Sequence, residues 1–257
     1  MINYRNINIF FLVTFVTLVV TNMKTAIPFY AYLVLALIYF LILAAGSYFI
    51  RANFFVRAIN NGPTSEKEIA LTFDDGPVTK YTPEILQILK EQKVEAVFFC
   101  IGARVDEHQS ICRQIIDEGH LIGNHSYSHD RWFDLYSSKK MAKDLSAMNE
   151  SLKNTTGLVP HFFRPPYGVT NPNLARAIER GNYITIGWNL RSLDTVIKDE
   201  KRLLQKLLRG SKPGGIILLH DKCEVTVKIL RQLITELRAR GFQISRLDKM
   251  LKLTPYA

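Results

Sequence analysis

The sequence predicts a parallel α/β domain preceded by one or two N-terminal membrane helices. From residue 66 onward, seven apolar strand-like runs alternate with six helix-like segments. Four of these helix-like segments are followed by a glycine, as helix C-termini are: Gly119, Gly181, Gly210 and Gly241. Ahead of them, residues 26–50 form an uncharged apolar run long enough to cross ~30 Å of hydrocarbon.

Composition narrows the classes of function. The chain has 257 residues, 47% of them hydrophobic, and a formal net charge of +10. The length allows one large domain or two small ones. The positive charge is spread out, and no basic-aromatic motif accompanies it, so we expect no nucleic-acid partner. Attraction to an anionic membrane surface or an anionic cell-wall polymer fits this charge equally well.

The N-terminal region is expected to be a membrane anchor over residues 1–58. A weak helix is possible over 7–22, a run that contains Asn8, Thr14 and Thr17, and the main transmembrane helix covers 26–50. Because Met23 and Lys24 precede the main run, translation from Met23 would give a single signal anchor. The alternative is a two-helix hairpin.

We expect the protein in the cytoplasmic membrane with its C-terminal domain on the outer side. Arg51 and Arg57 follow the main helix and argue against that orientation by the positive-inside rule. Residues 59–65 contain Asn-Gly-Pro and are predicted to be a linker, and the catalytic domain is expected over 66–250.

The elements of the domain can be assigned in order. Strands are predicted over 69–73, 94–101, 121–123, 161–164, 184–190, 215–219 and 242–247. Helices are predicted over 81–92, 105–118, 138–156, 172–180, 199–209 and 224–240. The three cysteines have no metal-type spacing, and a Cys100–Cys112 bridge stays open.

Polar residues follow five of the predicted strands directly. In parallel α/β folds the carboxyl ends of the strands carry the chemistry, so these residues form one candidate site. They are Asp74 and Asp75, the segment 124–129, the segment 164–168, the segment 191–194, and His220 with Asp221.

Two histidines in the segment 124–129 have the spacing of metal ligands. His125 and His129 are four apart, which on a helical turn places both imidazoles on one side. With one carboxylate from Asp74 or Asp75 they make three ligands and leave a position open for a catalytic metal. This donor set suits one divalent ion: zinc first, with cobalt or iron(II) possible.

The remaining polar residues supply acid–base chemistry. The aspartate that does not bind metal is free to act as a base on water, and His220 can protonate a leaving group. Arg164 can hold the base carboxylate in place. The prolines before Tyr167 fix the backbone, so that the Tyr167 N–H can bind a developing oxyanion.

At this point the sequence resembles the NodB-homology polysaccharide deacetylases, carbohydrate esterase family four. The resemblance covers roughly residues 66–247 and rests on four segments in the family's order: Thr72-Phe73-Asp74-Asp75-Gly76, His125-Ser126-Tyr127-Ser128-His129, Arg164-Pro165-Pro166-Tyr167 and Leu218-Leu219-His220. It implies a distorted (β/α)7 barrel that removes acetyl groups from N-acetylated sugars with one divalent metal.

The resemblance also implies a role for each matching residue. Asp74 corresponds to the catalytic base and His220 to the general acid. Asp75, His125 and His129 correspond to the metal ligands.

A second group of residues corresponds to the surroundings of the reacting atoms. Arg164 matches the arginine that orients the base, and Tyr167 matches the residue whose N–H helps bind the oxyanion. Pro166, Trp188 and Leu218 are expected at the substrate pocket.

One segment departs from the family pattern. After the fifth predicted strand, Arg191 replaces an acid and Thr195 replaces a tryptophan, whereas Asp194 remains. We therefore expect Asp194 in the site, as the nearest acid in sequence that could balance Arg164. The role of Arg191 stays open.

The predicted function is metal-dependent N-deacetylation of a cell-envelope or chitin-like glycan. One alternative is a membrane-tethered glycan-binding protein on an inactive barrel, and another is a metal-dependent phosphoesterase or amidase. The sequence does not indicate which glycan is the substrate, or the oligomeric state.

Overall fold

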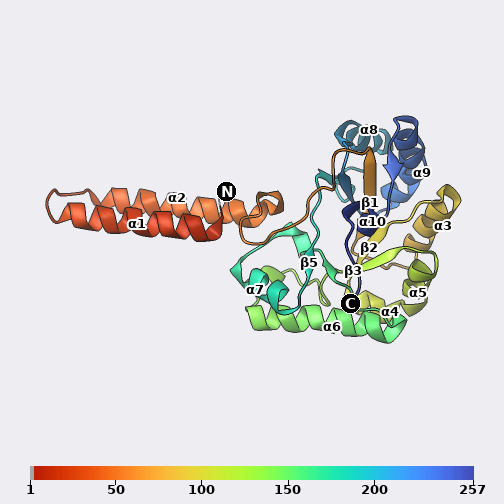
Figure 1. The fold of residues 1–257 in the computed structure, drawn as a ribbon, viewed down its shortest axis with the longest axis horizontal. Coiled ribbons are helices and arrows are strands. Elements are labelled where there is room, and N and C mark those ends of the chain that lie inside the picture. Colours follow the sequence, from red (N-terminus) through yellow and green to blue (C-terminus); the bar gives the residue numbers. More distant parts are fainter. Residues whose placement is uncertain (1–2) are drawn as a thin grey trace.

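A computed structural model describes residues 3–257 as a helical hairpin that projects from one side of an α/β domain (Figure 1). The hairpin consists of α1 (Tyr4–Asn22) and α2 (Phe29–Tyr48). Tyr39 Oη donates to Asn8 Oδ1 at 2.8 Å, and the Tyr39 ring lies 4.9 Å from that of Phe11. Both helices are long and apolar enough to cross a membrane, and only 6% of the residues in the apolar window of each are buried.

The domain is built on a parallel sheet in the order β5-β4-β3-β2-β1-β7-β6, with β8 paired to the start of β1. The strands are β1 (Glu68–Asp74), β2 (Val97–Cys100), β3 (Leu121–Asn124), β4 (Phe162–Phe163), β5 (Ile184–Thr185), β6 (Leu190–Arg191), β7 (Gly215–His220) and β8 (Gln243–Ile244). The parallel α/β prediction is confirmed, with the fifth predicted strand divided in two.

The sheet is curled into a distorted barrel, and the two strands made from the fifth predicted run show why. β5 and β6 lie at opposite edges of the sheet, yet they are consecutive in the chain. The connection from residue 185 to 190 reaches at most ~18 Å, whereas the edges of a flat seven-strand sheet would be ~29 Å apart. The sheet must therefore bend until its edges approach. The predicted single strand over 184–190 is wrong because this run crosses between the edges.

Helices pack on the outside of the curled sheet, as the 3.6-residue periodicity predicts. They are α3 (Thr82–Gln92), α4 (Gly102–Glu107), α5 (Gln109–Asp117), α6 (Ser138–Thr156), α7 (Pro172–Arg180), α8 (Glu200–Gly210) and α9 (Glu224–Ala239). The short helix α10 (Leu247–Leu251) packs instead in the cluster on the other face of the sheet. The helix predicted over 105–118 is interrupted at His108, whose φ and ψ of −130° and 48° are not helical. The strand predicted over 242–247 is shorter, because α10 begins at its last residue.

The core fixes β1 in the interior of the sheet. Leu71 and Phe73 belong to a cluster with α3 and α9, and the Phe73 ring stacks on Phe98 at 5.1 Å. Ala70, on the other face of β1, packs in a second cluster inside the curl. Because both faces are buried, the strand end that carries Asp74 is held rigidly. The three cysteines are free and buried, so a Cys100–Cys112 bridge is excluded.

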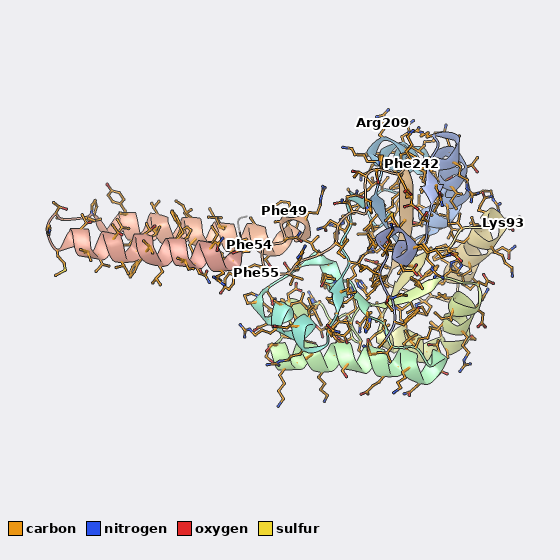
Figure 2. The ribbon with its side chains drawn as sticks, in the orientation of Figure 1. Phe49, Phe54, Phe55, Lys93, Arg209 and Phe242 are labelled. Carbon is orange, nitrogen blue, oxygen red and sulfur yellow. The ribbon has the colours of Figure 1, made fainter. Side chains whose placement is uncertain are left out.

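The hairpin is attached to the domain by more than a linker. Ser47 at the end of α2 accepts a hydrogen bond from Thr170 N at 3.0 Å and donates from its Oγ to Thr170 O at 2.7 Å. Figure 2 shows Phe49, Phe54 and Phe55 gathered where hairpin and domain meet. The predicted linker, residues 59–65, is bound to the domain in part: Ile59 bridges to Ile186, and Gly62 N donates to Gly214 O at 2.8 Å.

Candidate active site

The predicted site residues surround one cavity at the carboxyl ends of the strands. Its volume is about 230 Å³, and its lining comes from β1, β6 and β7 and from the loops that follow β3, β4, β5, β6 and β7. The lining residues are Asp74, Asp75, His125, His129, Pro165, Tyr167, Gly168, Trp188, Arg191, Thr195, Leu218, His220 and Lys222.

A larger cavity, about 570 Å³, lies at the opposite ends of the strands. It is lined by Glu68 at the start of β1 and by His120 just before β3. Catalytic residues of parallel barrels come from the carboxyl ends of strands, so the smaller cavity is the candidate active site.

Three side chains in the smaller cavity could hold a metal ion. One donor atom from each of Asp75, His125 and His129 lies within 4.8 Å of the others. Asp75 Oδ1 is 3.4 Å from His125 Nε2 and 3.2 Å from His129 Nε2. His125 Nδ1 lies 2.8 Å from the carbonyl oxygen of Arg164 and can bond it only as a donor, which leaves Nε2 with its lone pair.

The ionisation of these groups also suits a divalent cation. Burial lowers the pKa of His129 to about 4, so the imidazole is neutral at pH 7. Burial alone would raise the pKa of Asp75. The hydrogen bond and charge of His125, with contributions from His129 and Lys222, outweigh burial and hold the pKa of Asp75 well below its usual range. A carboxylate and two imidazoles are a donor set that fits zinc-type coordination.

The histidine pair does not lie on a helical turn, contrary to the prediction. Residues 125–129 form a loop after β3, in which Ser126 and His129 have φ values of 64° and 45°. Ser126 Oγ accepts from His129 N at 3.0 Å and closes the loop. The left-handed residues, rather than a helical repeat, bring the two rings within 4.9 Å.

Asp74 is paired with a fully buried guanidinium. Arg164 NH1 donates to Asp74 Oδ1 at 2.7 Å and to Thr72 Oγ1 at 2.8 Å. The same guanidinium donates to the carbonyls of Ile186 and Gly187, at 3.2 and 2.9 Å. The sequence did not single out Thr72, although its position two residues before Asp74 places both on one face of β1.

Asp194 pairs with His220, and not with Arg164 as expected. Asp194 Oδ1 lies 2.7 Å from His220 Nδ1, and Asp194 Oδ2 accepts from His220 N and from Thr226 Oγ1, each at 2.7 Å. The reason is the register of β6 on β7, which sets Arg191 opposite Leu218 and carries Asp194 to the end of β7. Thr226, on α9, gave no signal in the sequence.

The hydrogen bond with Asp194 determines the protonation state of His220. Burial alone would lower its pKa, but the hydrogen bond and charge of Asp194 outweigh burial and raise it. The Nδ1 proton is held by Asp194, and Nε2 has no hydrogen-bond partner within residues 3–257. An imidazolium in this position has one N–H to donate.

The Tyr167 backbone adopts a conformation that non-glycine residues rarely take. Its φ is 59°, and its N–H makes no hydrogen bond to any residue the structure describes. Strained backbone gathers around the cavity: left-handed φ values occur at Asp75, Ser126, His129, Tyr167 and Leu193. Such conformations persist where the surrounding fold imposes them, commonly at functional sites.

The cavity walls match the predicted pocket with one exception. Trp188 and Leu218 line the cavity, whereas Pro166 is buried behind it and Pro165 takes the expected place. Lys222, which the sequence analysis did not single out, also lines the cavity, with Nζ 2.7 Å from Asp75 Oδ2.

Arg191, whose role was open, lies at the cavity rim. It is exposed, and its guanidinium carbon lies 5.9 Å from the centre of the Trp188 ring. No carboxylate of residues 3–257 forms an ion pair with it.

Comparisons with known proteins agree with this geometry. Residues 61–185 match the polysaccharide deacetylase family model. A peptidoglycan-N-acetylglucosamine deacetylase of Bacillus cereus is 32% identical over 196 residues, which cover 75% of this chain and 71% of that protein. A peptidoglycan-N-acetylmuramic acid deacetylase of Bacillus subtilis is 31% identical over 194 residues, 74% of this chain and 73% of that protein.

Solved structures give the same result. The crystal structure of a peptidoglycan N-acetylglucosamine deacetylase in complex with an N-hydroxybenzamide superposes with a TM-score of 0.74 at 30% identity. It covers 77% of this chain and 94% of that one. A pseudoenzyme of carbohydrate esterase family four from Bacillus anthracis superposes with a TM-score of 0.71 at 29% identity, over 76% of this chain and 69% of that one.

Proposed function

The chain belongs to the polysaccharide deacetylase family, carbohydrate esterase family four, and on that premise we propose that it is an active, metal-dependent N-deacetylase of a glycan. The observation that carries the proposal is the meeting of three groups at one cavity. These are the donor set of Asp75, His125 and His129, the carboxylate of Asp74, and the imidazole of His220.

The donor set fits a divalent cation, and we take zinc as its first candidate, with cobalt or iron(II) possible. When bound, the cation supplies Lewis acidity that polarises the acetyl carbonyl and acidifies water. The proton transfers and the binding of the oxyanion are proposed for residues of this chain.

Asp74 is proposed to take the proton from the attacking water. Its Oδ1 is held by Arg164 at 2.7 Å, which fixes the carboxylate and leaves Oδ2 toward the donor set, 3.9 Å from His125 Nε2. Addition of water to the acetyl carbon forms a C–O bond and moves negative charge onto the carbonyl oxygen. The free N–H of Tyr167 is proposed to bind this oxyanion.

His220 is proposed to complete the reaction as the general acid. Asp194 holds the imidazole through Nδ1, so the proton on Nε2 is available to the sugar nitrogen as the C–N bond breaks. The products are acetate and a free amino sugar. Leu218 and Trp188 would enclose the acetyl methyl group and the sugar ring.

A second reading is a glycan-binding protein without activity. It is favoured by one observation: a structure similar to this chain is described as a pseudoenzyme. Against it, a binder has no use for the buried Asp74–Arg164 pair or for the pairing of His220 with the buried Asp194, which cost desolvation energy to maintain.

We further propose that α1 and α2 anchor the enzyme in the cytoplasmic membrane, with the domain on the outer side where envelope glycans lie. The helices expose an apolar surface whose one charged residue, Arg5, lies in the first turn of α1, and a soluble protein would not retain such a surface. In a hairpin, Arg5 lies with Arg51 and Arg57 at the domain end, and these charges oppose that orientation.

Acetate release tests the catalytic proposal. The purified full chain should liberate acetate from at least one member of a panel of N-acetylated glycans, including peptidoglycan and chito-oligosaccharides. The Asp74→Asn variant should lose roughly 10²–10⁴-fold in turnover, as loss of a general base does. Saturable glycan binding without acetate from any member would support the binding protein instead.

A further inference from the structure

We propose that residues 131–136, beside the active site, rest in the headgroup region of the membrane, so that the catalytic cavity opens at the bilayer surface. The proposal rests on the membrane anchoring inferred above and adds a second membrane contact, made by the catalytic domain itself. It follows from how the end of α2 is joined to the loops of the site.

The first link joins α2 to the loop that carries Tyr167. Ser47, in the last turn of α2, makes two hydrogen bonds to the backbone of Thr170, at 3.0 and 2.7 Å. Thr170 lies three residues after Tyr167, whose ring is 4.8 Å from that of His129. The emerging helix and the cavity wall therefore belong to one continuous structure.

The second link places residues 131–136 next to that junction. Asn171 Nδ2 donates to Asp134 O at 2.7 Å, one residue beyond Thr170. Phe133 is buried in the same cluster as Val56. Two residues before Val56, the ring of Phe54 packs so closely on α2 that a methyl group at Gly46 would lie 2.2 Å from it.

The third observation is what this region exposes. Trp132 and Leu135 are 57% and 74% exposed, although the neighbouring Phe133 is buried. Tyr48 and Phe49, where α2 leaves the membrane, are 66% and 59% exposed. We call these four residues, three aromatic and one aliphatic, the apolar collar. Aromatic side chains at the ends of membrane helices typically lie at the headgroup level, and Trp132 extends that belt onto the domain.

The charges around the collar suit an anionic lipid surface. The Arg131 guanidinium carbon lies 5.2 Å from the centre of the Trp132 ring, and Lys140 Nζ lies 3.4 Å from that of Tyr136. Asp130 and Asp134 are the acids of this stretch, and Asp130 is bonded to Trp132 N at 2.6 Å. Arg51 follows α2, and Arg57 adjoins Val56, which shares a cluster with Phe133. With Arg131 and Lys140 these make four basic side chains against two acids at the junction.

Tryptophan fluorescence tests the proposal, since the chain has two tryptophans. In the Trp188→Phe variant, Trp132 is the remaining reporter. The full chain is reconstituted in nanodiscs of phosphatidylcholine and phosphatidylglycerol, with and without lipids brominated near the headgroup end of the acyl chains. We expect a loss of Trp132 emission in the brominated discs, and emission from unbrominated discs at a shorter wavelength than in water.

Two control probes are placed in a background that carries Trp132→Phe and Trp188→Phe. Leu37→Trp, exposed on α2, should be quenched if the hairpin is inserted. Lys90→Trp lies on α3, which Figure 1 and Figure 2 place on the far side of the domain from the hairpin, and it should not be quenched.

The outcomes distinguish the membrane contact of residues 131–136 from the membrane anchor formed by α1 and α2. Quenching of Leu37→Trp without quenching of Trp132 would overturn the membrane contact of the domain and leave the anchor standing. Absence of quenching at both positions would overturn the anchor as well. If Trp132 responds to chito-oligosaccharide and not to brominated lipid, it is a platform for the glycan, and the membrane contact is wrong.

Discussion

The hydrogen bond between Asp194 and His220 sets the pH range in which the proposed general acid holds its proton. Asp194 raises the pKa of His220, so the proton is retained to a higher pH than in an ordinary histidine. Replacing Asp194 with Asn removes the negative charge and should lower the pKa of His220. The alkaline limb of the kcat/KM profile should therefore move to lower pH.

Metal analysis supplies the control for Asp194→Asn, since no ligand is altered and bound metal should not change. Thr226→Val removes only a neutral hydrogen bond to Asp194 and should shift the limb less. If Asp194→Asn unfolds more readily but keeps the alkaline limb of the wild type, Asp194 is a structural residue and His220 is not the acid.

Asp221, beside His220 in sequence, should make stability depend on pH. It is buried, its Oδ2 accepts from Thr82 Oγ1 at 2.7 Å, and its Oδ1 has no partner among the described residues. Burial raises its pKa from 3.8 to about 7. Between these values the folded state keeps a proton that the unfolded state has released, so stability falls as pH rises through this window.

The Asp221→Asn variant stays neutral and should lose this dependence. In metal-free protein, its free energy of unfolding should exceed that of the wild type above pH 7 by on the order of 4 kcal/mol, and the two should converge near pH 4. Urea titrations across this range measure the difference. If the free energies of unfolding of the two proteins change with pH in parallel, the ionisation of Asp221 does not destabilise the folded state.

At the residue scale, the sequence predicts which side chains gather at the cavity, but it does not predict every hydrogen-bonded pair among them. Asp74, Asp75 and His220 were found because they end strands that share one edge. The partner of Asp194 was misassigned, because the pairing of β6 with β7 is a property of the sheet. Arg164 had a nearer acid in Asp74 itself.

At the scale of elements, Arg164 ties the end of β1 to the segment that crosses between the sheet edges. Its guanidinium bonds Thr72 and Asp74 on β1 and the carbonyls of residues 186 and 187. Lysine carries one point charge and cannot reach both sides at once.

We therefore expect Arg164→Lys to destabilise the fold and to lower kcat together. The loss of stability should approach the 3–5 kcal/mol typical of broken buried pairs. Urea unfolding and acetate release measure the two effects. Arg209→Lys, the same substitution at an exposed arginine in the last turn of α8, is a control that should change neither by much. Unchanged stability in Arg164→Lys would mean that the crossing segment does not depend on this arginine.

Element prediction succeeded where a run stayed in one environment. β1, β3, β7 and the helices α3, α6, α7, α8 and α9 lie close to their predicted ranges. It failed over residues 184–190, where one apolar run serves both edges of the curled sheet. It also failed over residues 125–129, where left-handed backbone replaces a helical turn. The spacing of apolar residues predicts neither the crossing between sheet edges nor the left-handed loop.

At the scale of the whole molecule, the orientation of the hairpin decides where the enzyme works. Both ends of the hairpin lie on the side of the domain, because Tyr4 N donates to Phe54 O at 3.1 Å. We predict that protease added to intact spheroplasts cleaves the domain and leaves the hairpin in the membrane. A cytoplasmic membrane-associated protein serves as the control for leakage.

Protection of the domain in those spheroplasts would reverse the orientation. The arginines at residues 5, 51 and 57 would then be the correct signal, and the substrate would be a glycan on the cytoplasmic face. The contact between residues 131–136 and the bilayer does not depend on this outcome, since it concerns whichever leaflet the domain faces.

The central claim, that this chain is a metal-dependent deacetylase, is tested most directly by acetate release measured against bound metal. Dialysis of the full chain against a strong chelator should remove the metal and abolish acetate release, and added zinc should restore both. His125→Ala should lose both, without restoration, because two ligands hold the ion too weakly. Full acetate release from chelated protein that contains no metal would contradict the account.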